Sequence, residues 1–485
     1  MTEETELAEF EGSANAEPAE SKKPHFDRSI VEGPLAKAVW KIAWPAVLTN
    51  LVSGIQGWVD QIMVGNLIGY QANAAIGVGF QIFLVVIVFV SSIFIGMSVL
   101  VARFAGANQR EKVDRTVYQG FLTAIFMALG ILAPIGYFAA PYLLRIVTSD
   151  SDVLAEALPF LRIMFTCSVG MLIYFMMSGS LRSAGDARTP MVLGIVMTVL
   201  NLVFNIILIG GIGPIPAFGT AGSAMGTCIA SGLVGIYALY KLYSGTWVVS
   251  FPKTGYAPDL KVIRQLFKFG LPAGIQGIAM NVGGVIMAAF MGSLAQGKAT
   301  QAVYAVCYSQ LFLLVTWSSN ALMGASASVA GQNLGAGYPD RAVSAVRTAA
   351  SFGFGGAVIV GLFFFFIPRQ LLAIFGMTDP SVVEIGVELL RVLSVSGLFI
   401  SMALAYTGGL QGTGDTRSPL FISIISQVLF PVGICFIIKE TSTLQPIHIW
   451  LAVLVGHFAR FLLSFLRFNQ QRWRSITVDI ETTVA

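Results

Sequence analysis

The apolar positions of this chain gather into twelve long hydrophobic segments separated by short polar ones. Each segment is long enough for the roughly 20 residues with which an α-helix crosses the hydrocarbon core of a bilayer. The predicted spans are 40–64, 73–100, 116–140, 155–181, 190–212, 219–243, 265–292, 301–330, 344–367, 382–411, 418–438 and 446–468. This pattern predicts an all-α membrane protein with twelve transmembrane helices, six on either side of a polar linker.

A polar loop motif occurs twice, each time between two of these segments. Residues 178–191 and 407–420 share six identical positions at a constant offset of 229. The shared positions are Gly179, Leu181, Gly185, Asp186, Arg188 and Pro190, which recur as Gly408, Leu410, Gly414, Asp415, Arg417 and Pro419. We predict that the glycine ends one helix and that the Asp and Arg pair in the turn. Thr189 or Ser418 then caps the next helix, with Pro at its first position.

The same period runs through the rest of the chain. Trp44-Pro45-Ala46 returns as Leu271-Pro272-Ala273, and Gly106-Ala107 returns as Gly335-Ala336. A preserved order and a nearly constant offset indicate two homologous halves, roughly 40–245 and 265–470. An even number of spans brings each half back to the side where it started, so the repeats are parallel. Such a plan suits alternating access, in which two lobes rock about a site between them.

The composition agrees with a polytopic membrane protein. The chain has 485 residues, of which 55% are hydrophobic and only 11% charged, with a mean hydropathy of +0.77. A soluble protein carries roughly 25% charged residues. The net charge of +4 is spread over many loops, so no nucleic-acid partner is predicted. The four cysteines match no metal spacing and are predicted to be buried in apolar surroundings: Cys167, Cys228, Cys307 and Cys435.

Lys and Arg predict the orientation of the spans. Loop 101–115 carries four of these residues and the stretch 241–268 carries five, whereas loops 65–72 and 213–218 carry none. The positive-inside rule therefore places both termini, the linker and both loop motifs in the cytoplasm. The predicted division is a disordered cytoplasmic tail (1–33), an N-terminal six-helix lobe (34–245), a cytoplasmic linker (246–264), a C-terminal six-helix lobe (265–470) and a cytoplasmic tail (471–485).

Asp60 is the acidic residue that lies inside the first predicted span. A carboxylate at the bilayer centre costs about 2.5–3.5 kcal/mol on insertion scales, so such a residue usually faces a cavity or a partner. The alternative is an Asp near the outer mouth that is hydrogen-bonded to helix ends. Arg162 and Arg391 form a repeated pair that is predicted to anchor helix ends. His457 and Arg460 are predicted to be structural, with a proton relay through His457 as the alternative.

Together these features resemble the multidrug and toxic compound extrusion (MATE) family over about residues 35–468. The resemblance lies in the six-plus-six spans, Pro45, the sequence Val59-Asp60-Gln61 followed by Gly65, and the twin loops. It implies a V-shaped pair of lobes and a secondary antiporter. Such an antiporter expels amphipathic, often cationic organic compounds and takes in protons or sodium ions.

The details favour the prokaryotic branch called DinF-like, whose cation site lies in the N-terminal lobe. Asp60, Asn205 and Thr227 match that site, but the second acidic position on the fifth helix is Ile209. A sodium ion prefers several oxygen ligands and charge neutralisation, so a single carboxylate suits a proton better. Tyr174 and Asn201 are predicted to line the substrate cavity.

Two rival functions remain open from the sequence. A flippase for lipid-linked precursors requires a basic central cavity, and we expect no Lys or Arg at mid-membrane positions. A non-transport scaffold explains neither the internal symmetry nor Asp60. No catalytic residue, cofactor or metal site is predicted, so the chain is not expected to be an enzyme. The predicted partners are a small-molecule substrate and the lipid bilayer, with the chain acting as a monomer in a bacterial inner membrane or an archaeal cell membrane.

Overall fold

The computed structural model describes residues 26–148, 150–441 and 443–480, and the regular structure in these ranges is entirely helical. The N-terminal lobe contains α2 (Ser29–Glu32), α3 (Leu35–Leu67), α4 (Tyr70–Gly106), α5 (Arg110–Ile125), η1 (Phe126–Leu132), α6 (Ala133–Val147), α7 (Ser151–Thr166), α8 (Val169–Ser183), α9 (Arg188–Gly210) and α10 (Gly219–Ser244). The C-terminal lobe contains α11 (Leu260–Gly292), α12 (Gly297–Val306), η2 (Cys307–Leu311), α13 (Leu313–Gly335), α14 (Pro339–Phe366), α15 (Pro368–Ile374), α16 (Pro380–Gly412), α17 (Arg417–Ile424), η3 (Ile425–Leu429), α18 (Phe430–Thr441), α19 (Pro446–Asn469) and η4 (Arg472–Ser475).

These helices confirm the predicted all-α membrane fold. Eleven described segments are long and apolar enough to span a membrane, and the pair α7 and α8, bent by 51°, makes a twelfth. The segments η1, η2 and η3 are short π-helical turns inside otherwise continuous spans. The bend between α7 and α8 falls at Cys167, which is exposed. The prediction that all four cysteines are buried is confirmed for Cys307 and Cys435, but it was wrong for Cys167, and Cys228 is only half-buried.

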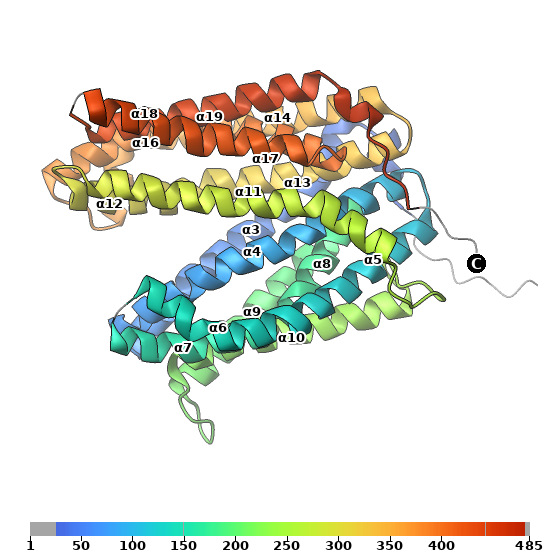
Figure 1. The fold of residues 1–485 in the computed structure, drawn as a ribbon, viewed down its shortest axis with the longest axis horizontal. Coiled ribbons are helices and arrows are strands. Elements are labelled where there is room, and N and C mark those ends of the chain that lie inside the picture. Colours follow the sequence, from blue (N-terminus) through green and yellow to red (C-terminus); the bar gives the residue numbers. More distant parts are fainter. Residues whose placement is uncertain (1–25, 149, 442, 481–485) are drawn as a thin grey trace, which may run out of the picture.

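The two lobes lie side by side and spread apart towards one end (Figure 1). They meet through α3 and α4 of the N-terminal lobe and α11 and α13 of the other. Gly106 and Gly335, a pair related by the repeat, permit the closest approach. A Cβ atom on Gly106 would lie 1.9 Å from the carbonyl oxygen of Gln332, and one on Gly335 would lie 2.0 Å from that of Arg103. The helices α4 and α13 therefore cross backbone to backbone at their C-terminal ends.

The repeated loops form turns at the same end of the molecule. Gly185 and Gly414 have φ angles of 105° and 97°, which a side chain would strain. The prediction that Thr189 and Ser418 provide the caps was wrong. Instead, the carboxylate of Asp186 accepts bonds from the backbone of Arg188 and Thr189, and one oxygen of Asp415 accepts a bond from the Ser418 nitrogen. The prediction that Asp and Arg pair within each loop was also wrong, because among the described residues neither Asp186 with Arg188 nor Asp415 with Arg417 forms an ion pair.

Asp415 differs from Asp186 in its ionic partner. The guanidinium of Arg467, near the end of α19, donates to Asp415 over 3.0 and 2.8 Å. In the first loop, Arg188 lies instead over the ring of Trp44. The second copy of the motif thus ties two helices of its lobe together, whereas the first copy mainly starts α9.

Part of the segment before α3, which was predicted to be a disordered tail over residues 1–33, is packed against the rest of the protein. Ile30 in α2 is fully buried, and its carbonyl accepts a bond from Asn333 in α13. Arg341 donates to the carbonyl of Gly33. Residues 26–33 are therefore part of the packed structure, and only residues 1–25 of the predicted disordered tail lie outside the described residues. The first helix of the second lobe also begins at Leu260, within the linker predicted at 246–264.

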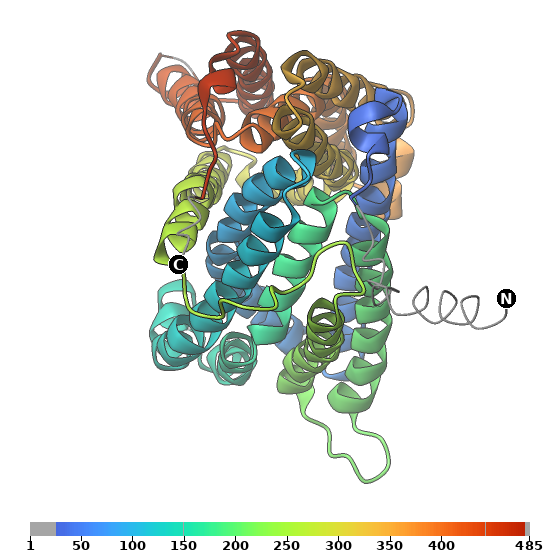
Figure 2. The same ribbon diagram turned by 90° about the vertical axis from the view of Figure 1, so that its right-hand side faces the viewer.

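The C-terminal segment crosses from one lobe to the other (Figure 2). The buried ring of Trp473 stacks on Phe468 at 5.2 Å between centroids. Beyond it, Arg103 on α4 donates to the carbonyl of Ile476 over 2.6 Å, and Lys112 pairs with Asp479 at 2.6 Å. This segment belongs to the predicted tail 471–485 and fastens α19 to α4 and α5.

Candidate functional site

A polar cluster surrounds Asp60 inside the N-terminal lobe. Asp60 lies on α3 and is half-buried. The amide nitrogen of Asn205 on α9 donates to its Oδ1 over 2.9 Å, and Asn205 itself is fully buried. The same nitrogen lies 3.2 Å from the amide oxygen of Asn201, one turn earlier on α9. A carboxylate and two amides thus share one small space between two membrane helices.

Thr227 joins the cluster from α10. Its hydroxyl lies 2.9 Å from the side-chain nitrogen of Asn201. Turning the Asn201 amide over places its nitrogen 3.3 Å from Asp60 Oδ1 and its oxygen on the Thr227 hydroxyl, so both orientations connect the same groups. Gly226 makes this possible, since a Cβ there would lie 2.1 Å from the Asn205 oxygen. The structure therefore brings together Asp60, Asn205 and Thr227, with Asn201 between them.

Gln56 is a member of the cluster that the sequence analysis missed. Its amide oxygen accepts a bond from the hydroxyl of Thr198 on α9 over 2.8 Å. It lies four residues before Asp60, hence on the same face of α3. That spacing was the available signal, because two polar residues one turn apart in an apolar span point towards the same neighbour.

Ile209 occupies the position where the resembling branch has a second acidic residue. It is 1% exposed and packs with Val64 and Ala72 in a small apolar cluster. It lies one turn beyond Asn205, on the same face of α9. The side of the cluster that could have held a second carboxylate is therefore closed by hydrocarbon.

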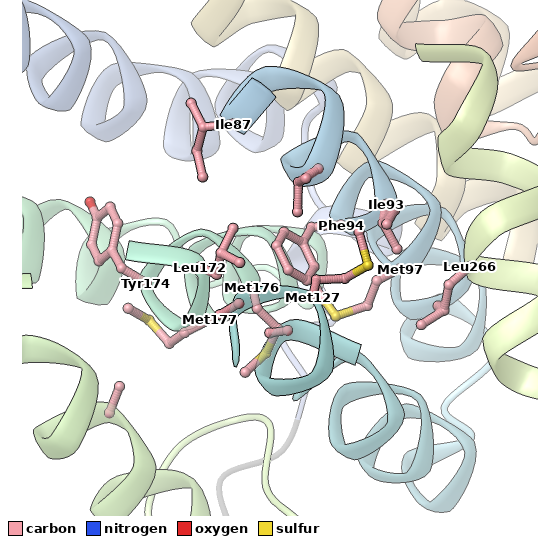
Figure 3. Packing of buried hydrophobic residues seen from close by; sticks show 14 of the residues in the cluster. Ile87, Ile93, Phe94, Met97, Met127, Leu172, Tyr174, Met176, Met177 and Leu266 are labelled. Atoms are coloured by element: carbon pink, nitrogen blue, oxygen red, sulfur yellow. The ribbon is translucent and has the colours of Figure 1, made fainter. Parts of the chain in front are cut away.

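Tyr174 and Asn201 were predicted to line a substrate cavity, and their burial argues against that role. Tyr174 is 6% exposed and lies on α8 in the main hydrophobic core with Leu172 and Met177 (Figure 3). Its hydroxyl donates to the carbonyl of Pro190 over 3.3 Å. Asn201 is 1% exposed and has its partners within the Asp60 cluster.

Two cavities lie between the lobes. One of about 640 Å³ is lined by Trp58, Gln61 and Ile62 of α3 and by Gln310 of η2. The other, of about 750 Å³, is lined by α11, by Gln81 and Val85 of α4, and by polar and aromatic residues of the C-terminal lobe. Side chains of both lobes line each cavity. The first cavity lies close to Asp60, since the next residue along α3, Gln61, is part of its lining.

The helix that carries Asp60 also carries contacts to the opposite lobe. The amide of Asn50 donates to the carbonyl of Trp317 over 3.0 Å, and the indole of Trp58 donates to Gln310 over 2.8 Å. Between them, Gly54 leaves room for the ring of Trp317. One face of α3 is thus bonded to α9 of its own lobe and another to α13 and η2 of the other lobe.

The remaining charged candidates divide into two kinds. Arg162 lies 4.4 Å from the centroid of the Tyr137 ring and donates to the Tyr137 carbonyl, and Arg391 lies over Phe365. These are the contacts of helix anchors. Arg460, by contrast, lies near the middle of α19 and is only 6% exposed. The expectation that mid-membrane positions lack Lys and Arg was therefore wrong.

Comparison with known proteins adds the following. The MatE family model matches residues 45–207 and again residues 272–437, once in each lobe. The probable multidrug resistance protein YoeA of Bacillus subtilis (strain 168) is 27% identical over 427 residues, covering 87% of this chain and 90% of that protein. The probable multidrug resistance protein NorM of Thermotoga maritima is 24% identical over 447 residues, with coverages of 92% and 94%.

Solved structures share the fold. One, described as the outward-facing conformation of a multidrug resistance MATE family transporter of the MOP superfamily, superposes with a TM-score of 0.85 at 20% identity and covers 93% of this chain and 98% of its own. A MOP superfamily transporter from Pyrococcus furiosus gives a TM-score of 0.83 at 19% identity, with coverages of 92% and 98%.

Proposed function

The chain belongs to the MatE family of multidrug efflux transporters, and from this premise we propose that it is a secondary antiporter that exports amphipathic, cationic organic compounds in exchange for protons. As a member of this family it is a transporter and not an enzyme. The observation that carries the proposal is the polar cluster around Asp60. A carboxylate held inside a membrane lobe by amides is a group that can change its protonation state during a transport cycle.

The hydrogen bonds of the cluster fit two protonation states. Ionised Asp60 is an acceptor only, and Asn205 supplies a donor at 2.9 Å. Protonated Asp60 gains a donor and needs an acceptor nearby. The Asn205 oxygen is buried and has no hydrogen-bond partner among the described residues, so it is available for that role after a small rotation. The neutral form can be enclosed between the helices, whereas the charged form requires water or a cation.

The position of α3 between the lobes connects this change to transport. Rearrangement of the bonds between Asp60 and α9 changes how α3 sits in its own lobe. Trp58, two residues away, then changes its contact with Gln310 in the opposite lobe. A proton and a cationic substrate would each favour a different arrangement of the lobes, by the difference in their affinities for the two states.

The membrane orientation follows from the Lys and Arg distribution. We place the end that carries α2, the linker and the C-terminal segment in the cytoplasm of a bacterial or archaeal cell. The two interlobe cavities then open towards the outside. The chain acts as a monomer in this proposal, since each lobe supplies one wall of the cavities.

Sodium is the alternative coupling ion. The oxygens of Asp60, Asn205, Asn201 and Thr227 are of the type that sodium accepts, but only one of them carries a full charge. Proteoliposomes with a fluorescent organic cation inside separate the two ions, when a proton gradient and a sodium gradient are imposed one at a time. We expect the proton gradient alone to drive efflux. Efflux driven by sodium alone would contradict proton coupling, and movement with neither gradient would contradict antiport.

A further inference from the structure

The C-terminal lobe contains a buried basic group to which the transport mechanism above assigns no role. His457 and Arg460 lie one turn apart on α19 and are 2% and 6% exposed. The Nδ1 atom of His457 lies 2.8 Å from the hydroxyl of Ser396 on α16. In the part of the chain that the structure describes, Arg460 forms no ion pair, and its Nε has no hydrogen-bond partner. A guanidinium left in this state inside a membrane protein is costly, which marks it as a group kept for a ligand.

A row of aromatic rings leads from this pair to the larger cavity. The ring of His457 stacks on Tyr308 at 6.5 Å, and Tyr308 stacks on Tyr304 at 4.8 Å with planes only 9° apart. Tyr304 in turn stacks on Trp450 at 6.1 Å. Both tyrosines line the cavity of about 750 Å³, and the guanidinium of Arg460 lies within electrostatic range of Tyr308. The cavity wall is therefore a set of parallel rings with a cation behind it.

Two π-helical turns shape the same wall. Tyr308 belongs to η2 and Gln427 to η3, and Gln427 also lines the cavity. Within the ranges that the structure describes, the buried amide nitrogen of Gln427 has no hydrogen-bond partner. Gly456, one turn before Arg460, lets η3 approach α19, since a Cβ there would lie 2.6 Å from the carbonyl of Ser426. π-Helical turns occur frequently at functional sites, and here η3 places the Gln427 amide on the cavity wall.

We propose that this cavity binds planar aromatic compounds that carry a carboxylate. The aromatic plane lies along Tyr304 and Tyr308, and the carboxylate reaches between Tyr308 and Gln427 to the donors of Arg460. Guanidinium and carboxylate match as a charge-assisted, two-point hydrogen-bonded pair. The inference rests on the proposed antiport, and it adds a preference among the exported compounds for those that join a cationic group to an aromatic acid.

The charge of the site limits the class of anion. A pyrophosphate or another multiply charged group would need several cations, and Arg460 is the one arginine among the residues described in this part of the lobe's interior. A single carboxylate neutralises a single guanidinium, which leaves no excess charge in the membrane. The lone cation therefore favours an aromatic monocarboxylate over a lipid-linked phosphate.

Rhodamine B and its ethyl ester provide a matched pair of probes. Both have the same cationic ring system, but only rhodamine B has a free carboxylate. Binding to the purified full-length protein, followed by fluorescence anisotropy without any ion gradient, should be tighter for rhodamine B. Arg460→Met should weaken the binding of rhodamine B by about tenfold, the cost of losing hydrogen bonds to a charged group. Binding of the ester should not change.

Arg391→Met is the control, because it removes an arginine of the same lobe that lies over the ring of Phe365 and away from the cavity. It should alter the binding of neither dye. If Arg460→Met does not fold, Gln427→Leu should reduce the preference for rhodamine B in the same direction. Equal affinity of the wild-type protein for both dyes would overturn the proposal, as would an equal loss of both dyes in folded Arg460→Met. If the wild-type protein binds rhodamine B more tightly than the ester but shows no gradient-driven efflux in proteoliposomes, only the antiport proposal would be rejected.

Discussion

The two lobes have the same helix order but buried side chains of opposite charge type. In the N-terminal lobe Asp60 lies among amides, and the position related to it by the repeat offset of 227 is Met287, a buried residue of the other lobe's core. In the C-terminal lobe the buried charge is Arg460. In the two proposals above, the acid of one lobe exchanges the coupling proton and the base of the other binds a carboxylate. The difference indicates that each lobe has its own task.

The lobes also differ in the regularity of their helices. The helix α9, which carries Asn201 and Asn205, is continuous, whereas its counterpart contains η3. Conversely, the fourth span is broken by 51° in the N-terminal lobe and continuous as α16 in the other. What the lobes share lies at the end where they meet, at Gly106, Gly335 and the twin loops. Of the differences in helix regularity, η3 bears on the proposed substrate site, since its Gln427 lines the larger interlobe cavity.

The shared end is where we expect the largest effect of a substitution. Gly106→Leu forces a side chain into the backbone of Gln332, which cannot move away without separating α4 from α13. The cost should exceed the about 1–3 kcal/mol of ordinary overpacking. The yield of monodisperse protein after detergent extraction should fall to nearly nothing. Gly355→Leu, at a glycine with open space around it, is the control and should express normally.

A second carboxylate in the N-terminal lobe tests the chemistry of its cluster. Ile209→Asp places an acid one turn from Asn205, in the small apolar cluster with Val64. Two carboxylates provide the charge and the ligands that sodium prefers, so efflux should become sodium-dependent, with roughly tenfold stimulation by a sodium gradient. Ile209→Asn is the control, because an Asn side chain has nearly the shape of Asp but carries no charge. Sodium stimulation in the Asn variant would show that the effect does not come from the added charge.

The two loop motifs allow a direct comparison within one molecule. Asp186→Asn weakens a helix start and should cost about 1 kcal/mol. Asp415→Asn should cost more, because it also removes the partner of Arg467, whose guanidinium is only 2.8 Å away. The unfolding temperatures of the two variants in detergent would rank them. Neither should change which ion drives efflux, and equal shifts would mean that the Arg467 pair contributes nothing.

The smallest effect is expected at the C-terminal segment that joins the lobes. Lys112→Gln removes an ion pair with Asp479, whose side chain is 61% exposed. Exposed pairs contribute about 0–1 kcal/mol, so the unfolding temperature should hardly change. A large drop would show that this strap is a main connection between the lobes. Trp473→Ala, which empties a fully buried position, serves as the positive control.

The sequence predicted the twelve spans because each needs only length and apolar composition. It also predicted that Asp60, Asn205 and Thr227 belong together, through family resemblance. It did not predict that Asp186 and Asp415 act as caps, since Asp, Thr and Ser in one turn are all suitable acceptors and only the backbone geometry selects among them. The sequence also did not predict that Arg460 is buried without an ionic partner among the described residues. The sequence shows that a polar residue lies in an apolar span, but not whether another residue pairs with it.

The central claim is that Asp60 exchanges the coupling proton. It is tested most directly by adding an organic cation without a carboxylate, such as the rhodamine ester, to purified protein in weakly buffered solution and following the pH with an indicator dye. Binding of the cation should release a proton from the wild-type protein and none from Asp60→Asn, whose amide keeps the shape but cannot ionise. The loop variant Asp186→Asn should behave as the wild type does. Proton release that persists in folded, cation-binding Asp60→Asn would contradict the account.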